Sequence, residues 1–325
     1  MNSRAAGRPL VLVDAAIPDA PFASLEEAAE VVRFDGDADL ARLLAERGGE
    51  VAGLGVQLTT TIDRQLLTRL PALEIVADYA VGYDNVDLAA AAERGVAVTH
   101  TPDVLTEATA DLTWGLILAV ARRVLEGDRI VRSGVWTGWH PRQLLGMELA
   151  GATLAILGMG RIGEAVARRG MAFGMRIVYW SRSPRPEVER KLGARRLDLE
   201  TVLSESDVVS VHLPLADDTR HLLDAGRLAL MKSGSILVNT SRGPIVDEDA
   251  LADALDAGCL MGAGLDVHER EPAIHPRLAA SPRTVLLPHL GSATVETRER
   301  MAEVVARNLL AVVGGGPPTD PVPIS

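Results

Sequence analysis

Three ionisable residues late in the chain each follow a short hydrophobic run that is typical of a buried strand. Arg242 comes after "SILVN", Glu271 after "GLDV" and His289 after "TVLLP". Open α/β sheets bind their ligands at the carboxyl ends of the strands. There, a permanently charged planar guanidinium suits a carboxylate, a histidine can supply or remove a proton near neutral pH, and a nearby glutamate stabilises the imidazolium. Together they suit the reduction of a 2-keto acid. Taken singly, each could be an ordinary hydrogen-bonded or solvated residue.

A glycine-rich stretch, "LGMGRIG", lies between the expected strand "TLAIL" and the expected helix "RIGEAVARRGMAFG". Its Gly158, Gly160 and Gly163 form the G-x-G-x-x-G pattern. The first glycine makes a tight turn, the second lets the backbone approach a pyrophosphate, and the third lets helix and strand pack closely. The helix N-terminus then offers N–H groups to the phosphates. Three glycines can also simply build a turn, but this context predicts a dinucleotide site.

The next expected strand, "RIVYW", indicates which dinucleotide would bind. A site for NAD usually has an Asp or Glu at the end of this strand, which holds the ribose 2′-hydroxyl. Here the strand is followed by Ser181, Arg182 and Ser183, which suit the 2′-phosphate of NADP. We therefore favour NADP(H). The alternative is that Arg182 is a solvated surface residue and that NAD(H) is accepted as well.

Short hydrophobic runs alternate with amphipathic segments over almost the whole chain, the pattern of a parallel sheet covered by helices. Two α/β units are expected, with a boundary between residues 100 and 150. A long helix is expected from Glu107 to Val124, capped by Thr106, and another covers "TVETRERMAEVVARNLLAVV". The tail beyond "GGGPP" is expected to be mobile. The expected strands are "LVLVD", "VVRF", "VAGLG", "EIVAD", "VAVTH", "TLAIL", "RIVYW", "DVVSVHL", "SILVN", "GAGLD" and "TVLLP".

Composition narrows the possible functions. A formal net charge of −11 over 325 residues, without a basic stripe, argues against nucleic-acid binding. Cys259 is the single cysteine, which excludes a disulfide scaffold, and its apolar neighbourhood predicts a core position. No signal peptide or membrane span is recognisable, so a cytoplasmic protein is expected. No metal site is expected, because the remaining histidines lack ligand spacing; these are His100, His140, His221 and His275.

At this point the chain resembles a known family. "LGMGRIG", "HLPL", "NTSRGPIVDEDAL", "GAGLDVHEREP" and "LPHLGSAT", with "AVGYDNVDL" near residue 80, look like the motifs of the D-isomer-specific 2-hydroxyacid dehydrogenases. Their order and spacing agree over nearly the whole chain. The resemblance implies that Arg242 binds the substrate carboxylate and carbonyl, that His289 is the acid/base, and that Glu271 is its partner.

The resemblance also implies the domain organisation, which periodicity alone does not give. Residues 1–102 and 292–325 would form a flavodoxin-like substrate domain. Residues 103–291 would form an inserted Rossmann domain for the dinucleotide, with hinges near Pro102 and Gly291. The long helix after Thr106 would help to form a homodimer.

Further site residues follow from the resemblance. Arg161 and Ile162 would lie on the pyrophosphate, Asp266 near the nicotinamide carboxamide, and the backbone amides of Val81 and Gly82 at the substrate carboxylate. Leu54 would also face the substrate. The rest of the implied cofactor site comprises His212, Leu213, Pro214, Thr219, Thr240, Ser241 and Gly291.

Within the family the chain looks most like the glyoxylate/hydroxypyruvate reductases. "VWTGWHP" resembles the segment in which a tryptophan, here Trp139, reaches the active site of the partner subunit; simple packing between subunits is the alternative. The polar stretch "GLGVQLTTTID", and His268 at a position that is often aromatic, leave other small acids such as pyruvate, or bulkier 2-keto acids, open as substrates. A dinucleotide-sensing protein similar to the C-terminal-binding corepressors is a further alternative, because it would share the fold.

Overall fold

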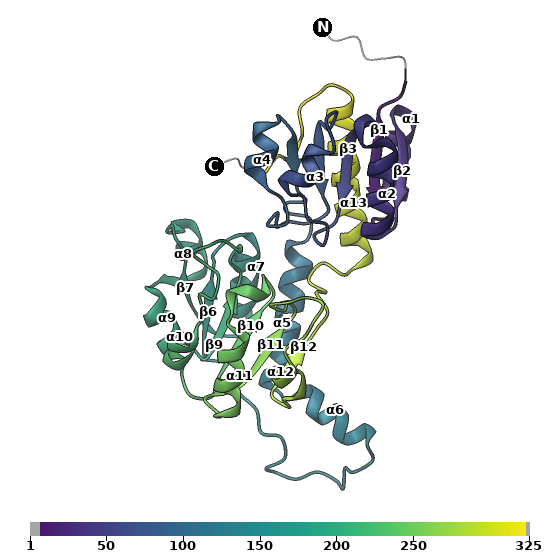
Figure 1. Ribbon diagram of the computed structural model, residues 1–325. Coiled ribbons are helices and arrows are strands. Elements are labelled where there is room, and N and C mark those ends of the chain that lie inside the picture. The colour runs from purple at the N-terminus through teal and green to yellow at the C-terminus, as the bar shows by residue number, and fades with distance from the viewer. Residues whose placement is uncertain (1–6, 323–325) are drawn as a thin grey trace. The chain divides into compact units, whose positions relative to one another are not determined.

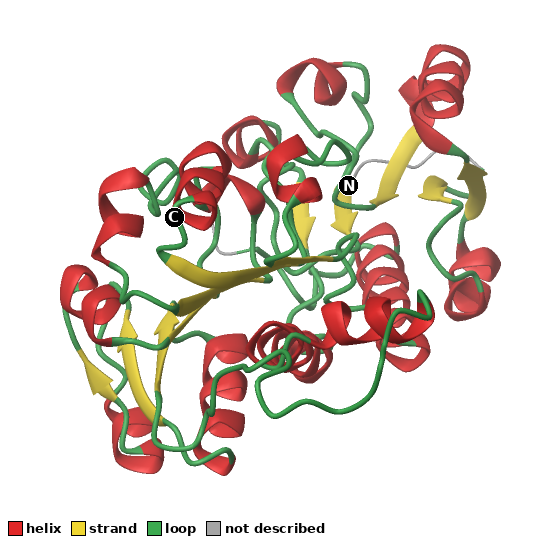
Figure 2. Ribbon diagram, turned by 90° about the horizontal axis from the view of Figure 1, so that it is seen from below, coloured by secondary structure: helices red, strands yellow, loops and turns green. Residues whose placement is uncertain are grey.

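The computed structural model describes residues 7–322 and divides them into two compact units. The first unit comprises the residues up to Leu105 and those from Ser292 onward, and the second runs from Thr106 to Gly291. Each unit is an α/β structure with one parallel sheet (Figures 1 and 2). No helix in the described part of the chain is long and apolar enough to span a membrane.

The first unit has five parallel strands in the order β2-β1-β3-β4-β5, which is the flavodoxin-like order. Of the stretch "GLGVQLTTTID", residues 53–56 belong to β3, and the polar residues from Gln57 onward follow the strand. The C-terminal helix α13 lies against β3 and β4 of this sheet. The elements are β1 (Leu10–Asp14), α1 (Ala23–Ala28), β2 (Glu30–Phe34), α2 (Gly36–Arg47), β3 (Val51–Val56), α3 (Arg64–Thr68), β4 (Ile75–Asp78), α4 (Leu88–Glu93), β5 (Ala97–Thr99) and α13 (Val295–Val313), with 3₁₀ turns at Ala20–Phe22 and Gly48–Glu50.

The second unit has seven parallel strands in the order β12-β11-β10-β9-β6-β7-β8. Read from the other edge, this is the doubly wound dinucleotide-binding order with one strand added. The elements are α5 (Thr106–Ala121), α6 (Val124–Arg132), β6 (Thr153–Leu157), α7 (Arg161–Ala172), β7 (Arg176–Trp180), α8 (Pro186–Leu192), β8 (Arg195–Arg196), α9 (Leu199–Glu205), β9 (Val208–Val211), α10 (Ala225–Leu230), β10 (Ser235–Asn239), α11 (Glu248–Asp256), β11 (Leu260–Leu265), α12 (Pro276–Ala280) and β12 (Thr284–Leu286), with a 3₁₀ turn at Gly243–Ile245.

Alternation along β6 explains why helices cover both faces of this second sheet. Leu154 and Ile156 pack into a core with α5, α7 and α8, whereas Ala155 and Leu157 pack into a second core with α9 to α12. All five residues of β6 are buried, as expected for a central parallel strand. The expected strands all occur; the two-residue β8 was not expected.

The expected single helix after Thr106 is wrong at both ends. Thr106 is the first residue of α5 rather than its cap, and α5 ends at Ala121. The carbonyl oxygen of Ala121 accepts from the N–H of Met147, 2.8 Å away, so the returning chain takes the place of the next helical turn. Arg123 then adopts a left-handed conformation (φ 53°) and α6 starts in a new direction.

Two further expectations are wrong. The tail is docked as far as Val322: its N–H donates to the carbonyl of Val98 (2.9 Å), and Pro321 pairs with Thr99 on β5. Asn308 of α13 accepts from two N–H groups of this tail, which fixes it from the other side. Cys259 is exposed rather than buried, because it lies in the turn between α11 and β11, directly after Gly258 with its φ of 71°.

Candidate active site

The expected site loops of the second unit all follow one row of paired residues at the carboxyl edge of its sheet. Across the strands from β7 to β12 the row pairs each residue with its neighbour: Trp180, Leu157, Val211, Asn239, Leu265 and Leu286. The glycine loop, the Ser181 turn, and the turns that carry Arg242, Glu271 and His289 all leave the sheet just past this row. Strand register therefore brings them to the same edge.

The glycine loop has the geometry of a phosphate cradle. Gly158 has a φ of 99°, and a Cβ there would lie 2.5 Å from the carbonyl oxygen of His212. A Cβ on Gly163 would lie 2.2 Å from the carbonyl oxygen of Gly158, so only glycine lets α7 start this close to β6. A Cβ on Gly160 would meet nothing within 4 Å. The loop is thus closed behind and open at Gly160, next to Arg161 and Ile162 in the first turn of α7, as a bound pyrophosphate requires.

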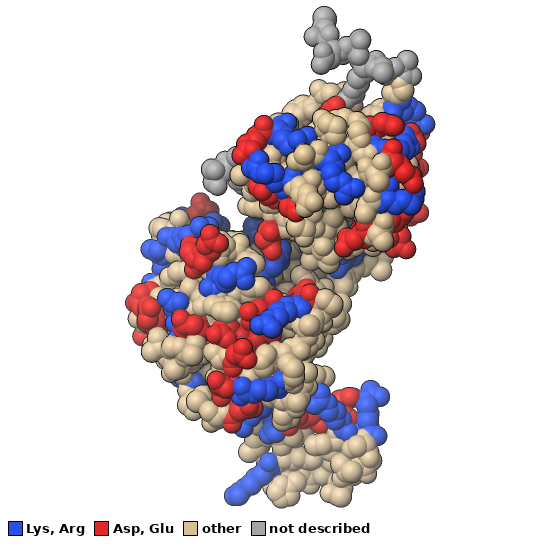
Figure 3. Space-filling view, in the orientation of Figure 1, with Lys and Arg blue, Asp and Glu red and all other residues tan. Residues whose placement is uncertain are grey.

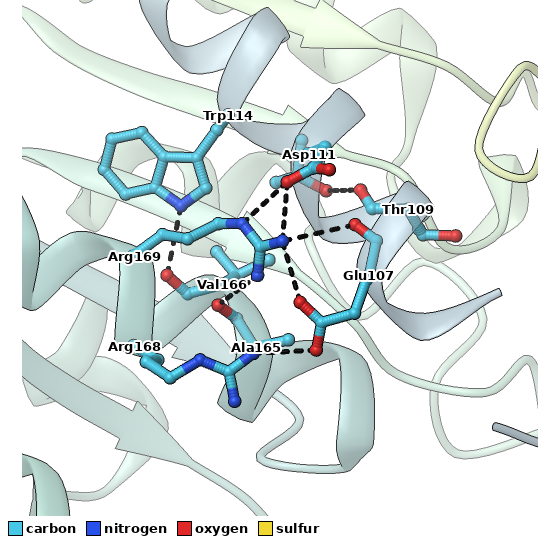
Figure 4. Close-up of polar contacts among 9 residues, drawn as sticks. Glu107, Thr109, Asp111, Trp114, Ala165, Val166, Arg168 and Arg169 are labelled. Carbon is cyan, nitrogen blue, oxygen red and sulfur yellow. Dashed lines mark hydrogen bonds and ion pairs between the residues drawn. The ribbon is translucent and has the colours of Figure 1, made fainter. Parts of the chain in front are cut away.

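Ion pairs link α5 to α7, the helix that follows the glycine loop (Figure 4). Arg169 donates to Asp111 at 2.5 Å and to Glu107 at 2.8 Å, and Arg168 donates to Glu107 at 2.7 Å. The hydrogen bonds from both arginines hold the pKa of Glu107 below its ordinary value. The indole N–H of Trp114 donates to the carbonyl of Val166 at 3.0 Å. These polar contacts join the two helices along their shared face.

The turn after β7 presents backbone and hydroxyl groups around Arg182. The hydroxyl of Ser181 donates to the carbonyl of Ser183 at 2.6 Å. Arg196, on the short strand β8, donates to the carbonyls of Ser181 (2.9 Å) and Arg182 (3.0 Å). Arg196 was not anticipated from the sequence. It adds a second guanidinium to the turn expected to meet the ribose.

Other residues expected at the cofactor are engaged in holding their own loops. Thr219 bonds the carbonyl of Pro214 and the N–H of Ala216, both at 2.8 Å, and Thr240 shares a hydrogen bond of 2.9 Å with Thr113. Ser241 donates to the carbonyl of Leu213. The N–H of His212 donates to the carbonyl of Leu157 (2.7 Å), and its ring bonds the hydroxyl of Ser210 (2.8 Å). These contacts fix the loop backbones.

Asp266 carries a buried carboxylate oxygen, Oδ2, that could accept a hydrogen bond from a ligand. Its Oδ1 accepts from the N–H of Leu290 at 2.7 Å, but Oδ2 is buried and finds no hydrogen-bond partner among the described residues. Burial raises the pKa of this carboxyl. Gly291 lies close by, with its Cβ position 3.4 Å from Oδ2. An unpaired acceptor of this kind fits the amide donor of a nicotinamide carboxamide.

Arg242 stands on a turn that the structure supports from two sides. Asn239 accepts from the N–H of Ser241 (3.0 Å) and donates to the carbonyl of Arg242 (2.8 Å). A Cβ on Gly243 would lie 1.9 Å from the backbone carbon of His268. The Arg242 turn therefore packs directly on the loop that leads to Glu271. Asn239 and Gly243 were not anticipated, although both lie in the quoted motif.

His289 and Glu271 are in direct contact. Nδ1 of His289 lies 3.0 Å from Oε2 of Glu271, and the other carboxylate oxygen accepts from the N–H of His268 at 3.0 Å. Burial would raise the pKa of Glu271, but these two hydrogen bonds and the positive charges of His289 and His268 outweigh it and lower that pKa. A charged Glu271 keeps the proton on Nδ1, so Nε2 is the nitrogen through which His289 exchanges protons. His289 itself has a φ of 57°, a strained backbone conformation of the kind found at functional sites.

The expected substrate residues of the first unit lie on β3 and after β4. The carbonyl of Val81 contacts Nδ1 of His100 at 2.9 Å, and the His100 ring packs edge-on against Tyr83, next to Gly82. Leu54 lies in β3 with its side chain completely buried in the core of this unit, which leaves only its backbone for a ligand.

Trp139 lies in the long segment between α6 and β6, which extends away from the body of the second unit (Figure 1). Together, α6 and this segment are called the α6 arm. The Trp139 side chain is 83% exposed, and four other large apolar side chains of the arm are also exposed: Val131, Val135, Trp136 and Leu145.

Comparison with known proteins identifies the family of this chain. Residues 114–291 match the family described as D-isomer specific 2-hydroxyacid dehydrogenase, NAD binding domain. The chain belongs to the D-isomer specific 2-hydroxyacid dehydrogenase family, as its motifs predicted. It is an oxidoreductase that uses a nicotinamide dinucleotide and acts on a small acid.

Particular relatives carry more specific names. A glyoxylate reductase of Thermococcus litoralis is 48% identical over 95% of both chains. A glyoxylate reductase of Aeropyrum pernix is 54% identical over 85% of this chain and 84% of its own length. Among solved structures, the NADPH-dependent glyoxylate/hydroxypyruvate reductase of Sinorhizobium meliloti, in complex with NADP and malonate, has a TM-score of 0.88 at 39% identity and covers 97% of each chain.

Proposed function

We propose that this chain reduces glyoxylate and hydroxypyruvate to the corresponding 2-hydroxy acids, with NADPH as the preferred reductant. The observation that carries the proposal is the 3.0 Å contact between His289 and Glu271 at the sheet edge that also carries Arg242 and the glycine loop. The names of the relatives support the choice of substrate. When bound, the reduced nicotinamide supplies a hydride.

The side chains of the second unit supply the remaining parts of the reaction. Arg242 holds the substrate carboxylate and polarises the keto oxygen. His289 donates the proton from Nε2 to that oxygen as the hydroxyl forms, and Glu271 stabilises the imidazolium before the transfer. Asp266 accepts a hydrogen bond from the nicotinamide carboxamide. In the first unit, the backbone amides of Val81 and Gly82 are assigned to the substrate carboxylate by similarity to the family.

The test is steady-state reduction of glyoxylate, hydroxypyruvate and pyruvate, each with NADPH and with NADH. We expect turnover of the first two and a preference for NADPH. Turnover of pyruvate alone would overturn the substrate assignment and keep the chemistry. Tight cofactor binding with negligible turnover of all three would favour the sensing alternative.

The preference for NADPH rests on Arg182 and on the turn that Arg196 supports. Replacing Arg182 by Ala removes one charge-assisted contact to the 2′-phosphate, worth about 1.5–3 kcal/mol, so KM for NADPH should rise by about 10- to 100-fold while KM for NADH stays unchanged. Arg185→Ala is the matched control, because Arg185 is exposed in the same turn and lies outside the Ser-Arg-Ser stretch. Equal effects of both variants would argue against the assignment.

A homodimer through the α6 arm completes the proposal. The arm exposes several large apolar side chains, and the lower end of the surface in Figure 3 is largely uncharged, whereas acidic and basic groups alternate elsewhere on that face. Exposed apolar patches of this kind mark association surfaces. Light scattering should give twice the chain mass, and Trp139→Ala should weaken the dimer. A wild-type monomer at micromolar concentration would refute this part.

A further inference from the structure

The loop that carries Glu271, residues 266–272, is held by contacts beyond the one to His289. Glu269 of this loop pairs with His221, with Nε2 and Oε1 2.9 Å apart. His268 of the same loop faces Glu248, the first residue of α11, with Nδ1 and Oε1 3.8 Å apart. The second of these pairs is nearly completely buried, with 3% and 7% of the two side chains exposed. Burying either group without a partner would be costly, so the two side chains depend on each other.

His268 is fixed from both sides of its ring. Nε2 lies 3.0 Å from the carbonyl oxygen of Leu287, in the segment between β12 and His289, so this nitrogen carries a proton. Nδ1 is buried and makes no direct hydrogen bond, since 3.8 Å to Glu248 is an ion-pair distance. Glu248 Oε1 in turn accepts from the N–H of Glu269 at 3.1 Å. The pair therefore joins the start of α11 to the Glu271 loop and to the segment that leads to His289.

The charged groups acting on His268 are Glu248 from α11 and Glu271 from its own loop. Burial would lower the pKa of His268, but Glu248, the Leu287 carbonyl and Glu271 outweigh it, so that pKa is raised. A protonated His268 places a positive charge beside Glu271, whose Oε1 also accepts from the His268 backbone N–H at 3.0 Å. The side chain and the backbone of one residue thus act on the same carboxylate.

We propose that His268 and Glu248 form a buried positioning pair that holds the Glu271 carboxylate charged and oriented toward His289. The proposal rests on the proposed function, because it assigns a role to the Glu271–His289 contact. His268 does not touch substrate. It acts through Glu271, whose Oε1 accepts from the His268 backbone N–H.

The test compares pH profiles of kcat/KM for glyoxylate reduction. Replacing His268 by Phe, or by Gln to keep a donor toward Leu287, removes the charge beside Glu271. The acid limb, which reports protonation of Glu271, should then move to higher pH by about half a unit to one unit. Glu248→Gln should do the same, because His268 without its carboxylate loses its proton. The double variant should shift no further than either single variant.

The matched control lies one residue along the chain. Asp249 pairs with His275 at 3.0 Å on the same first turn of α11, and neither residue contacts Glu271. Asp249→Asn and His275→Phe should leave the acid limb in place. An unmoved limb in the His268 variants, or an equal shift in the His275 variant, would overturn the proposal.

A second measurement separates the failure of this inference from failure of the proposed function. Histidine-labelled protein followed by NMR should show His268 losing its proton at a lower pH in Glu248→Gln than in the wild type, because the Glu248 carboxylate raises the pKa of His268. This holds whether or not glyoxylate is reduced. A His268 resonance that titrates identically in both proteins would overturn the pair itself.

Discussion

The glycine loop allows stability and cofactor binding to be separated by two substitutions of the same kind. Gly163→Ala places a methyl group 2.2 Å from the Gly158 carbonyl oxygen and 2.9 Å from Cγ2 of Ile156. Gly160→Ala places one where nothing lies within 4 Å, at φ −82° and ψ −166°, which alanine adopts without strain. The first substitution therefore changes the folded protein, whereas the second changes only the space left for a ligand.

The magnitudes follow from these distances. The contact of Gly163→Ala is with backbone, which no change of side-chain rotamer relieves, so its cost lies near the upper end of the range for overpacking, about 3 kcal/mol. Alanine returns about 1 kcal/mol of helix propensity. The net loss of about 2 kcal/mol lowers the melting temperature of the second unit by about 4–8 °C. Gly160→Ala costs about 0.5 kcal/mol at a helix N-cap, or about 1–2 °C.

For Gly160→Ala we expect a large loss of cofactor affinity and only a small loss of stability. A methyl group at the open side of the loop holds the pyrophosphate off the backbone and costs one charge-assisted hydrogen bond, about 1.5–3 kcal/mol or 10- to 100-fold in Kd. The assay is thermal unfolding without cofactor, together with titration of NADPH by tryptophan fluorescence. A Gly160→Ala variant that melts like Gly163→Ala, or that binds NADPH like the wild type, would refute this assignment of roles to the two glycines.

Three more predictions concern the neighbouring residues. Burial raises the folded-state pKa of Asp266, so its ionisation costs folding free energy as pH rises above about 4; Asp266→Asn should raise the melting temperature at pH 7 but not at pH 3.5, while weakening NADPH binding. If Asp266→Asn changed the melting temperature by the same amount at pH 7 and at pH 3.5, that result would count against a buried, ionised Asp266. Glu271 has a lowered pKa, so its contribution to turnover should persist well into the acid range, and Glu271→Gln should lower kcat at least 10-fold and abolish that limb of the kcat/KM profile. An unchanged limb would remove Glu271 from the mechanism. Arg169→Met breaks ion pairs to Glu107 and Asp111, whose carboxylates are largely exposed, so it should cost only about 0.5–1 kcal/mol, seen as a melting point about 1–4 °C lower that converges on the wild type at high salt. A loss several times larger would mean that α7 depends on these pairs for its placement.

Much of the site could be predicted from the sequence because its residues lie just past the ends of strands. The run "SILVN" followed by Arg242 needs only the rule that parallel sheets bind ligands at their carboxyl edge. The same holds for the glycine loop and for His289. The flavodoxin-like and Rossmann arrangements of the strands could be expected only from resemblance to a family. A hydrophobic run by itself does not indicate which strand lies next to it in the sheet.

What was missed depends on contacts between segments far apart in the chain. The end of α5 at Ala121 is set by an N–H from Met147, and the docking of the tail by the carbonyl of Val98. No local pattern near Ala121 or Val322 reveals these partners. The exposure of Cys259 was misjudged for the opposite reason, since its apolar neighbours belong to α11 and β11 and the turn between them faces outward.

Strand order determines which of the predicted residues can act together. Because β10, β11 and β12 are neighbours, with Asn239, Leu265 and Leu286 in one register row, the following turns meet in pairs: the turn of Arg242 packs on the loop of Glu271, and that loop reaches His289. The middle strand carries the loop that contacts both of the others. In the proposed role of His268 and Glu248, fixing this loop also orients Glu271 toward His289. A change in this loop should alter the substrate arginine and the acid/base together, because the loop contacts both neighbouring turns.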